Sequence, residues 1–190
     1  MANTVGYVSV GKPKIGGAIY RAPLSASLTI PTDVSTALAA DFKCLGSVSE
    51  DGVTNSNAIT TEKIKAWGGD TVLTPITEKD DTFKFTLIEV MNEDVVKAVY
   101  GDDNVTVTAA SGDNPKAIAV DVNNDEQPEC AWVIDMVLRG GHLKRIVIPD
   151  GKITEIGDIV YKDDEAVCYE VTVTAMADAS GNTHYEYMTA

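Results

Sequence analysis

Glycines near the N-terminus have the spacing of a phosphate-binding loop. Gly11 and Gly16 are separated as in such loops, whose backbone N–H groups cradle phosphate oxygens. The loop also needs a lysine and then a serine or threonine after its second glycine, but Gly17 and Ala18 occupy those positions. The sequence therefore predicts no phosphate site and no nucleotide cofactor in this segment.

A second segment imitates the start of a calcium-binding loop. Asp121, Asn123 and Asp125 alternate as the first oxygen ligands of such a loop do. Glu126 then stands where the sharp turn needs glycine, and Trp132 stands where a bidentate glutamate should close the site. We therefore expect a solvated turn between two strands and no metal.

Nucleophiles and general bases are few and scattered. His142 and His184 lie in no recognisable nucleophile motif, so we expect ordinary surface positions for both. Cys44, Cys130 and Cys168 are far apart and odd in number, which favours buried free thiols over disulfides or metal ligands. No spacing of carboxylates identifies a glycosidase pair. The sequence thus predicts a protein that is not an enzyme.

The charge balance restricts the partners. The chain has 190 residues with 29 acidic and 15 basic side chains, a formal net charge of −14. Gripping duplex DNA requires lysine and arginine against the phosphates, so this balance argues against it. The one basic cluster, Arg139 with His142, Lys144 and Arg145, is interpreted as a solvated strand face rather than a phosphate or acidic-partner site.

Most of the chain carries the period-two pattern of β-strands. From 166 to 176, Val167, Tyr169, Val171 and Val173 alternate with polar residues, which predicts a strand with one wet face. Further strands are expected at 42–48, 61–67, 71–77, 82–90, 105–109, 117–122, 130–139, 142–148, 153–161 and 183–188, with a strong turn signal at 149–151. Many short strands favour a mainly β fold, a β-sandwich of antiparallel strands.

One short helix is expected at about 92–100. Asn92 is suited to be its N-cap, and Gly101 follows where a helix often ends. Val95 with Val99 forms an i, i+4 apolar pair, so the helix should pack on a sheet.

Two segments do not fit the strand pattern. Residues 1–24 are rich in glycine and proline and predict an extended N-terminal arm, which leaves 25–190 as the sandwich domain. Residues 47–60 are polar and predict a long loop, of a length that usually has a function or is disordered. No apolar run reaches membrane-spanning length, and residues 1–10 lack a secretory signal pattern, so we expect synthesis in a cytoplasm.

Two short motifs stand out in the middle of the chain, Trp67-Gly68-Gly69-Asp70 and Val99-Tyr100-Gly101. Further stretches accompany them in order, at 45–53, 64–66, 85–89, 157–159, 169–171 and 181–187. Together, over about residues 40–188, they resemble the major tail proteins of long, non-contractile bacteriophage tails, and the two motifs are the most specific elements of the similarity.

The resemblance implies a structural virion protein, assembled in the host bacterial cytoplasm into stacked hexameric rings of the siphovirus tail tube. Its partners would be further copies of itself, a tape-measure protein and tip or terminator proteins, with no membrane partner. DNA would pass through without specific binding. We expect inter-subunit or inter-ring contacts from Glu50, Asp51, Gly52, Val53, Asn55, Lys12 and Lys14.

The net charge gives this expectation a mechanism. Six copies in a ring would multiply the charge of −14, and an acidic lumen would repel the DNA backbone. Glu170, Thr172 and Thr174, on the wet face of the 166–176 strand, are the lumen-facing candidates.

Two other classes stay open. An Ig-like adhesion or carbohydrate-binding module would share the strand pattern, remain monomeric and expose an aromatic patch, with Trp67 as the candidate, since Trp132 lies mid-strand and fits a core. A hydrolase is disfavoured by the missing motifs.

Overall fold

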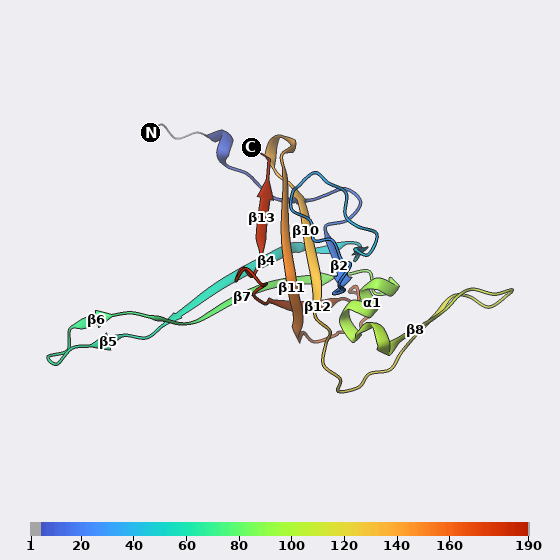
Figure 1. Cartoon of the computed structure of the whole chain (residues 1–190). Helices are drawn as coiled ribbons and strands as arrows, with labels where there is room; N and C mark the ends of the chain where they lie inside the picture. Colours follow the sequence, from blue (N-terminus) through green and yellow to red (C-terminus); the bar gives the residue numbers. More distant parts are fainter. Residues whose placement is uncertain (1–4, 190) are drawn as a thin grey trace.

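The chain folds mainly into antiparallel β-structure with one α-helix, as the sequence predicted (Figure 1). The structure is a computed structural model that describes residues 5–189. Its strands are β1 Lys12–Pro13, β2 Ile19–Pro23, β3 Lys43–Cys44, β4 Val48–Thr61, β5 Ile64–Lys65, β6 Thr71–Leu73, β7 Ile76–Leu87, β8 Val105–Thr108, β9 Ala117–Val120, β10 Cys130–Val137, β11 Leu143–Ile156, β12 Tyr169–Ala175 and β13 Tyr185–Met188. Helix α1 is Glu93–Tyr100, and short 3₁₀ turns are η1 Val5–Tyr7, η2 Asp102–Asn104 and η3 Arg139–Gly141.

One nine-stranded sheet forms the body of the protein. Its order is β3-β2-β10-β11-β12-β7-β4, with β1 also paired to β10 and β13 to β11. The expected sandwich is therefore a single continuous sheet folded over its core rather than two separate sheets. Two small two-stranded sheets lie on projections from this body: β5–β6 near the end of one, and β8–β9 on the part of the other that is nearer the body (Figure 1).

The main core lies on the inner face of the folded sheet. Alternation fills it, because Phe83, Phe85 and Leu87 of β7 and Val171 and Val173 of β12 point inward and are buried. Trp132 and Ile148 come from the opposite wall, and Val95 and Val99 of α1 cover one end of the core. Trp132 was expected in the core and is buried.

Helix α1 has the boundaries that its capping residues predicted. The side chain of Asn92 accepts a hydrogen bond from the backbone N–H of Asp94, and the N–H of Gly101 bonds to the carbonyl of Lys97. These contacts satisfy backbone groups that have no partner inside a short helix.

A second apolar cluster covers the outer face of β10 and β11. Ala131, Val133 and Val147 pack with Phe42 and with apolar residues of the 24–42 crossing. Strand β10 is thus buried on both faces from Cys130 to Asp135, which makes it the centre of the body.

A buried ion pair ties this second layer to the sheet. Arg145 of β11 meets both carboxylate oxygens of Asp135 of β10, Nε to Oδ1 at 2.6 Å and NH2 to Oδ2 at 2.8 Å. The guanidinium also donates to the carbonyls of Asp33 and Thr36, and Lys14 reaches Asp135 at 3.1 Å. Burial opposes ionisation of Asp135, but these donors outweigh it and hold the pKa of Asp135 below its usual range.

The basic cluster predicted from the sequence is therefore not a solvated face. Arg145 is buried in the pair with Asp135, and Lys144 is paired with Glu186 at 2.9 Å. The alternation of side chains along β11 sends these neighbouring residues to opposite faces of the sheet, so they do not act as one patch.

The largest errors in the sequence predictions of backbone structure concern three segments, and the strands expected at 42–48 and 153–161 are also shorter than predicted. The polar segment 47–60 is not a loop: it is mostly strand β4, paired with β7. The turn expected at 149–151 is absent because β11 continues through it, and Gly151 provides a close approach to Trp132, whose indole N–H donates to the Gly151 carbonyl at 3.0 Å. Residues 1–24 are not wholly an arm, because Ile19–Pro23 is the sheet strand β2. Residues 1–4 of that arm, and residue 190, lie outside the described residues.

Candidate assembly surfaces

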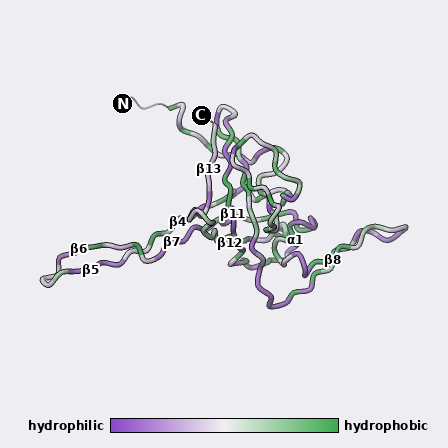
Figure 2. Tube along the Cα trace, viewed as in Figure 1, coloured by the Kyte–Doolittle hydropathy of each residue, from purple (hydrophilic) through white to green (hydrophobic). Residues whose placement is uncertain are grey.

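The β4–β7 hairpin projects far from the body and carries apolar residues that its own chain does not cover (Figures 1 and 2). Strand β4 has 14 residues, about 45 Å at the rise of an extended strand. No residue from 57 to 80 is buried. The exposed side chains nevertheless include large apolar ones, namely Ile59, Ile64, Trp67, Val72, Leu73 and Ile76.

The hairpin tip is an ordered turn that presents Trp67. The N–H of Ala66 donates to the carbonyl of Asp70 at 2.7 Å, and the N–H of Gly69 donates to the carbonyl of Ala66 at 3.0 Å. Gly68 and Gly69 have φ angles of +117° and +98°, which side-chain-bearing residues rarely adopt. Trp67 is fully exposed at this turn, beside the cross-strand pair of Ile64 and Leu73.

A buried carboxylate fixes the root of the hairpin. Asp81 is the last inward-facing residue of β7 before the hairpin leaves the core, and its carboxylate accepts from Asn55 at 2.8 Å, Thr183 at 2.6 Å and His184 at 2.5 Å. Burial opposes its ionisation, but these hydrogen bonds outweigh burial and hold the pKa of Asp81 below its usual range. His184, expected at the surface, is instead half-buried against Asp81 and Phe83.

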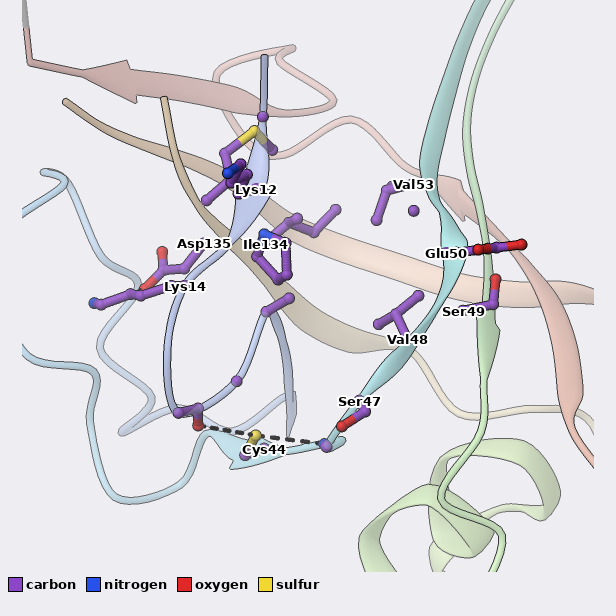
Figure 3. A pocket seen from close by; sticks show the side chains of 18 of the residues that line it. Lys12, Lys14, Cys44, Ser47, Val48, Ser49, Glu50, Val53, Ile134 and Asp135 are labelled. Atoms are coloured by element: carbon purple, nitrogen blue, oxygen red, sulfur yellow. Dashed lines mark hydrogen bonds and ion pairs between the residues drawn. The ribbon is translucent and has the colours of Figure 1, made fainter. Parts of the chain in front are cut away.

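A groove of about 920 Å³ lies between β1 and the start of β4 (Figure 3). Its apolar surface comes from Val48 and Val53 of β4 and from Ile134 and Met136 of β10. Cys44 closes one end, where its thiol bonds to the carbonyl of Gly16. Lys12 and Lys14 stand on the β1 side, and Glu50 and Asp51 stand on the β4 side.

A bulge in β4 shapes the acidic side of this groove. Val48 pairs with Leu87 and Val53 pairs with Phe85, so β4 advances by five residues while β7 advances by two. The extra residues bend the strand, and Gly52 takes a φ of +69° within the bulge. Glu50 and Asp51 are exposed there and form no ion pair among residues 5–189.

The groove brings together six of the seven contact candidates from the sequence: Lys12, Lys14, Glu50, Asp51, Gly52 and Val53. Asn55 lies outside it and uses its amide on Asp81 and on the carbonyl of Thr82. The exposed apolar hairpin tip was not among the candidates. Trp67 beside Gly68-Gly69 was the available signal, because a large aromatic residue at a glycine turn has no core to enter.

The three lumen candidates share one polar face of the sheet. Glu170, Thr172 and Thr174 of β12 stand opposite Thr86, Lys84 and Thr82 of β7, and all of them lie away from the core. Lys84 pairs with Glu170 at 2.8 Å, and Thr174 shares a 2.7 Å hydrogen bond with Thr154 of β11. The face is rich in hydroxyl groups, and its lysines and glutamates roughly balance.

Strand β4 ends the sheet beside this polar face. Among the described residues it pairs with β7 alone, which leaves its other edge without a strand partner. A long unpaired edge is a template for pairing with another chain. No helix within residues 5–189 is long and apolar enough to cross a membrane.

The mainly β fold thus presents several exposed faces suited to contact other chains. A family model described as phage tail tube protein matches residues 13–190, and the chain belongs to that family. It is therefore a structural component of a phage tail. No curated protein matches the sequence. A solved structure of the tube-terminating cap of the anti-feeding prophage aligns with it over 100% of each chain, at 9% identity and a TM-score of 0.47.

Proposed function

We propose that six copies of this chain join edge to edge into a ring, and that rings stack into a tube through which DNA leaves the capsid. The observation that carries the proposal is the unpaired edge of β4 next to the polar face of β7, β12 and β11. Closing a ring would give every such edge a partner and would place the polar face around a lumen.

The composition of this face supports free passage of DNA. Phosphate backbones are retained by clusters of lysine and arginine. Lys84 is paired with Glu170, and the rest of the face carries threonine hydroxyls and the carboxylate of Glu155, which accepts from Thr172. The net charge of −14 per copy led us to expect an acidic lumen. On this face Lys84 offsets Glu170 and Glu155 is left over, so the lumen that we propose is polar with a small acidic excess.

The tail tube assignment also suggests partners. A tape-measure protein would fill the lumen before DNA passes, and tip and terminator proteins would cover the two ends of the tube. Assembly would take place in the host cytoplasm, with no membrane partner and no cofactor.

Electron microscopy of the purified chain at rising concentration tests the assembly. We expect rings or tubes of uniform diameter. A chain that stays monomeric at high concentration, even with added tail tips as nuclei, would overturn the proposal.

A labelling experiment tests the lumen face. In assembled tubes, Thr172→Cys should react with a small maleimide but not with a maleimide attached to a large protein, over the background of the native thiols. Thr106→Cys on the β8–β9 hairpin is the control and should react with both. Equal reaction of Thr172→Cys with both reagents would remove β12 from the lumen.

An adhesion module remains the second candidate, favoured by the exposed Trp67. Its tip is a narrow two-stranded turn, whereas a carbohydrate platform needs a broad surface. A persistent monomer that binds glycans through Trp67 would favour this candidate.

A further inference from the structure

We infer that the hairpin tip of one copy, residues 62–75, seats in the β1–β4 groove of a second copy, with Trp67 as the anchor. This inference rests on the proposed function and specifies the contact between copies. Two unsatisfied surfaces of one chain carry it. The tip exposes apolar side chains with no core of its own, and the groove exposes an apolar floor.

Backbone hydrogen bonds close the turn at the tip. The bonds across Ala66 and Asp70 reduce the conformational freedom that would be lost on binding. A tryptophan side chain buries about 150–250 Å² when it is covered, and tryptophan is enriched among residues that dominate interfaces. The groove, at about 920 Å³, has room for the indole and for the flanking Ile64 and Leu73.

The charges of the two surfaces are complementary. Lys63 and Lys65 flank the apolar residues on one strand of the tip and form no ion pair among residues 5–189. Glu50 and Asp51 on the β4 side of the groove are likewise unpaired there. We therefore place strand β5 along the bulge of β4, which leaves Asp70 of the tip toward Lys12.

The occupant must be a second copy. Strand β4 lines the groove from Val48 to Val53 and is paired with β7 as far as Thr61, so the tip is held about 25 Å or more from its own groove. Donor and acceptor are different surfaces of the same chain. Such a contact does not close on two copies but propagates head to tail, as a filament requires.

Truncating the anchor tests the tip. Trp67→Ala should raise the protein concentration at which tubes form by about 30-fold or more, the effect of losing a dominant interface residue. Tyr161→Ala, an exposed aromatic on the loop before β12, is the control and should leave it unchanged. Equal assembly of Trp67→Ala and the unsubstituted chain would overturn the inference while the proposed tube function stands. Failure of the unsubstituted chain to assemble would instead overturn the proposed function.

A charge-reversal cycle tests the groove. Lys63→Glu with Lys65→Glu should raise the assembly concentration about tenfold through like-charge repulsion. Adding Glu50→Lys and Asp51→Lys should restore it to within about twofold. Adding Asp163→Lys and Asp164→Lys instead corrects the net charge equally but lies on the exposed loop before β12, and it should not restore assembly. If both pairs of lysine substitutions restore assembly, or if neither does, the tip does not bind beside Glu50 and Asp51.

A disulfide test fixes the contact directly. A copy with Trp67→Cys is mixed with a copy with Ser49→Cys at a concentration above the raised assembly threshold of the Trp67 variant. The mixture should form a covalent heterodimer on oxidation, because Ser49 lines the groove. Asp163→Cys, on the exposed loop before β12, replaces Ser49→Cys in the control mixture and should give no such product. Peptide mapping should find the thiol introduced at position 67 joined to the one introduced at position 49. A link from position 67 only to thiols outside the groove would show that the tip does not occupy it.

Discussion

The body and the β4–β7 hairpin follow opposite rules. In the body, strand β10 is buried on both faces, and even its charges are internal, as Asp135 and Arg145 show. In the hairpin no residue from 57 to 80 is buried, and apolar side chains face outward. An isolated two-stranded hairpin is marginally stable in water. The contrast agrees with a body that folds around its own core and with the proposed role of the hairpin as a contact to another chain.

The body and the hairpin should differ most in the loss of folding stability when a charged side chain is removed from each. Arg145→Ala leaves Asp135 buried with only Lys14 as a partner, and we expect a loss of about 3–5 kcal/mol in the free energy of unfolding. Lys65→Ala at the hairpin tip should leave the urea midpoint unchanged. Urea titration followed by tryptophan fluorescence measures both. A small effect of Arg145→Ala would show that the second layer does not depend on this pair.

The stability that Asp81 provides at the junction of the body and the hairpin should depend on pH. The pKa of Asp81 is lower in the folded chain than in the unfolded one. Its stabilisation is therefore present above the unfolded pKa of about 3.9 and is lost as pH falls through the folded value. Asp81→Asn should cost about 1–3 kcal/mol at neutral pH and flatten the loss of stability below about pH 4.

Asp80→Asn is the matched control for this junction, because Asp80 is the exposed neighbour on the same strand. Thermal unfolding from pH 2 to 7 compares the two variants. If Asp81→Asn loses stability below about pH 4 as steeply as the unsubstituted chain, the acid sensitivity belongs to other carboxylates, and Asp135 is the first to test.

A smaller difference in stability is expected between alanine substitutions of two asparagines, one in the body and one in the hairpin. Asn92 caps helix α1, and Asn92→Ala should lower stability by about 1 kcal/mol. Asn57→Ala on the hairpin removes the same side chain from an exposed position and should stay within about 0.5 kcal/mol. Thermal unfolding at pH 7 measures both, and equal losses would mean that the hairpin contributes to the cooperative unit.

The smallest effect should follow the largest deletion. Ala58 and Asp80 are cross-strand partners, so Asn-Gly can replace residues 59–79 as a two-residue hairpin loop. Because no residue in the deleted part is buried, we expect the free energy of unfolding to stay within about 0.5 kcal/mol of that of the full chain. Urea titration checks stability, and circular dichroism checks that β-structure remains. A large loss would show that the hairpin supports the body.

Sequence patterns predicted the body and the two strands at the hairpin tip better than strand β4, for a physical reason. The alternation in β12 and the caps of α1 were informative because each element has one buried side. Outside the body, β4 has no buried side, so its polar residues look like those of a loop although its backbone is paired with β7 from Val53 to Thr61. Periodicity reports burial, and a strand without burial gives no such signal.

The candidate site was predictable in part. The groove residues were found through charged and glycine-rich segments, but their proximity depends on the pairing of β1 with β10, which is set by distant contacts. Asp81 and His184 lie more than 100 positions apart, and no local pattern joins them. Gly151 was misinterpreted because the same residue that permits a turn also permits close packing.

The bulge at the start of β4 has a consequence for how the hairpin can change length. It sets the pairing of β4 with β7, so the strands cannot slide past each other without removing residues 49–52 from the bend. Side chains alternate with period two, so inserting one residue in each strand would turn Ile64 and Leu73 to the opposite face, whereas inserting two would keep their face. The length of the hairpin can therefore change only in steps of about 6.6 Å, the rise of two strand residues, if its apolar face is to keep its direction.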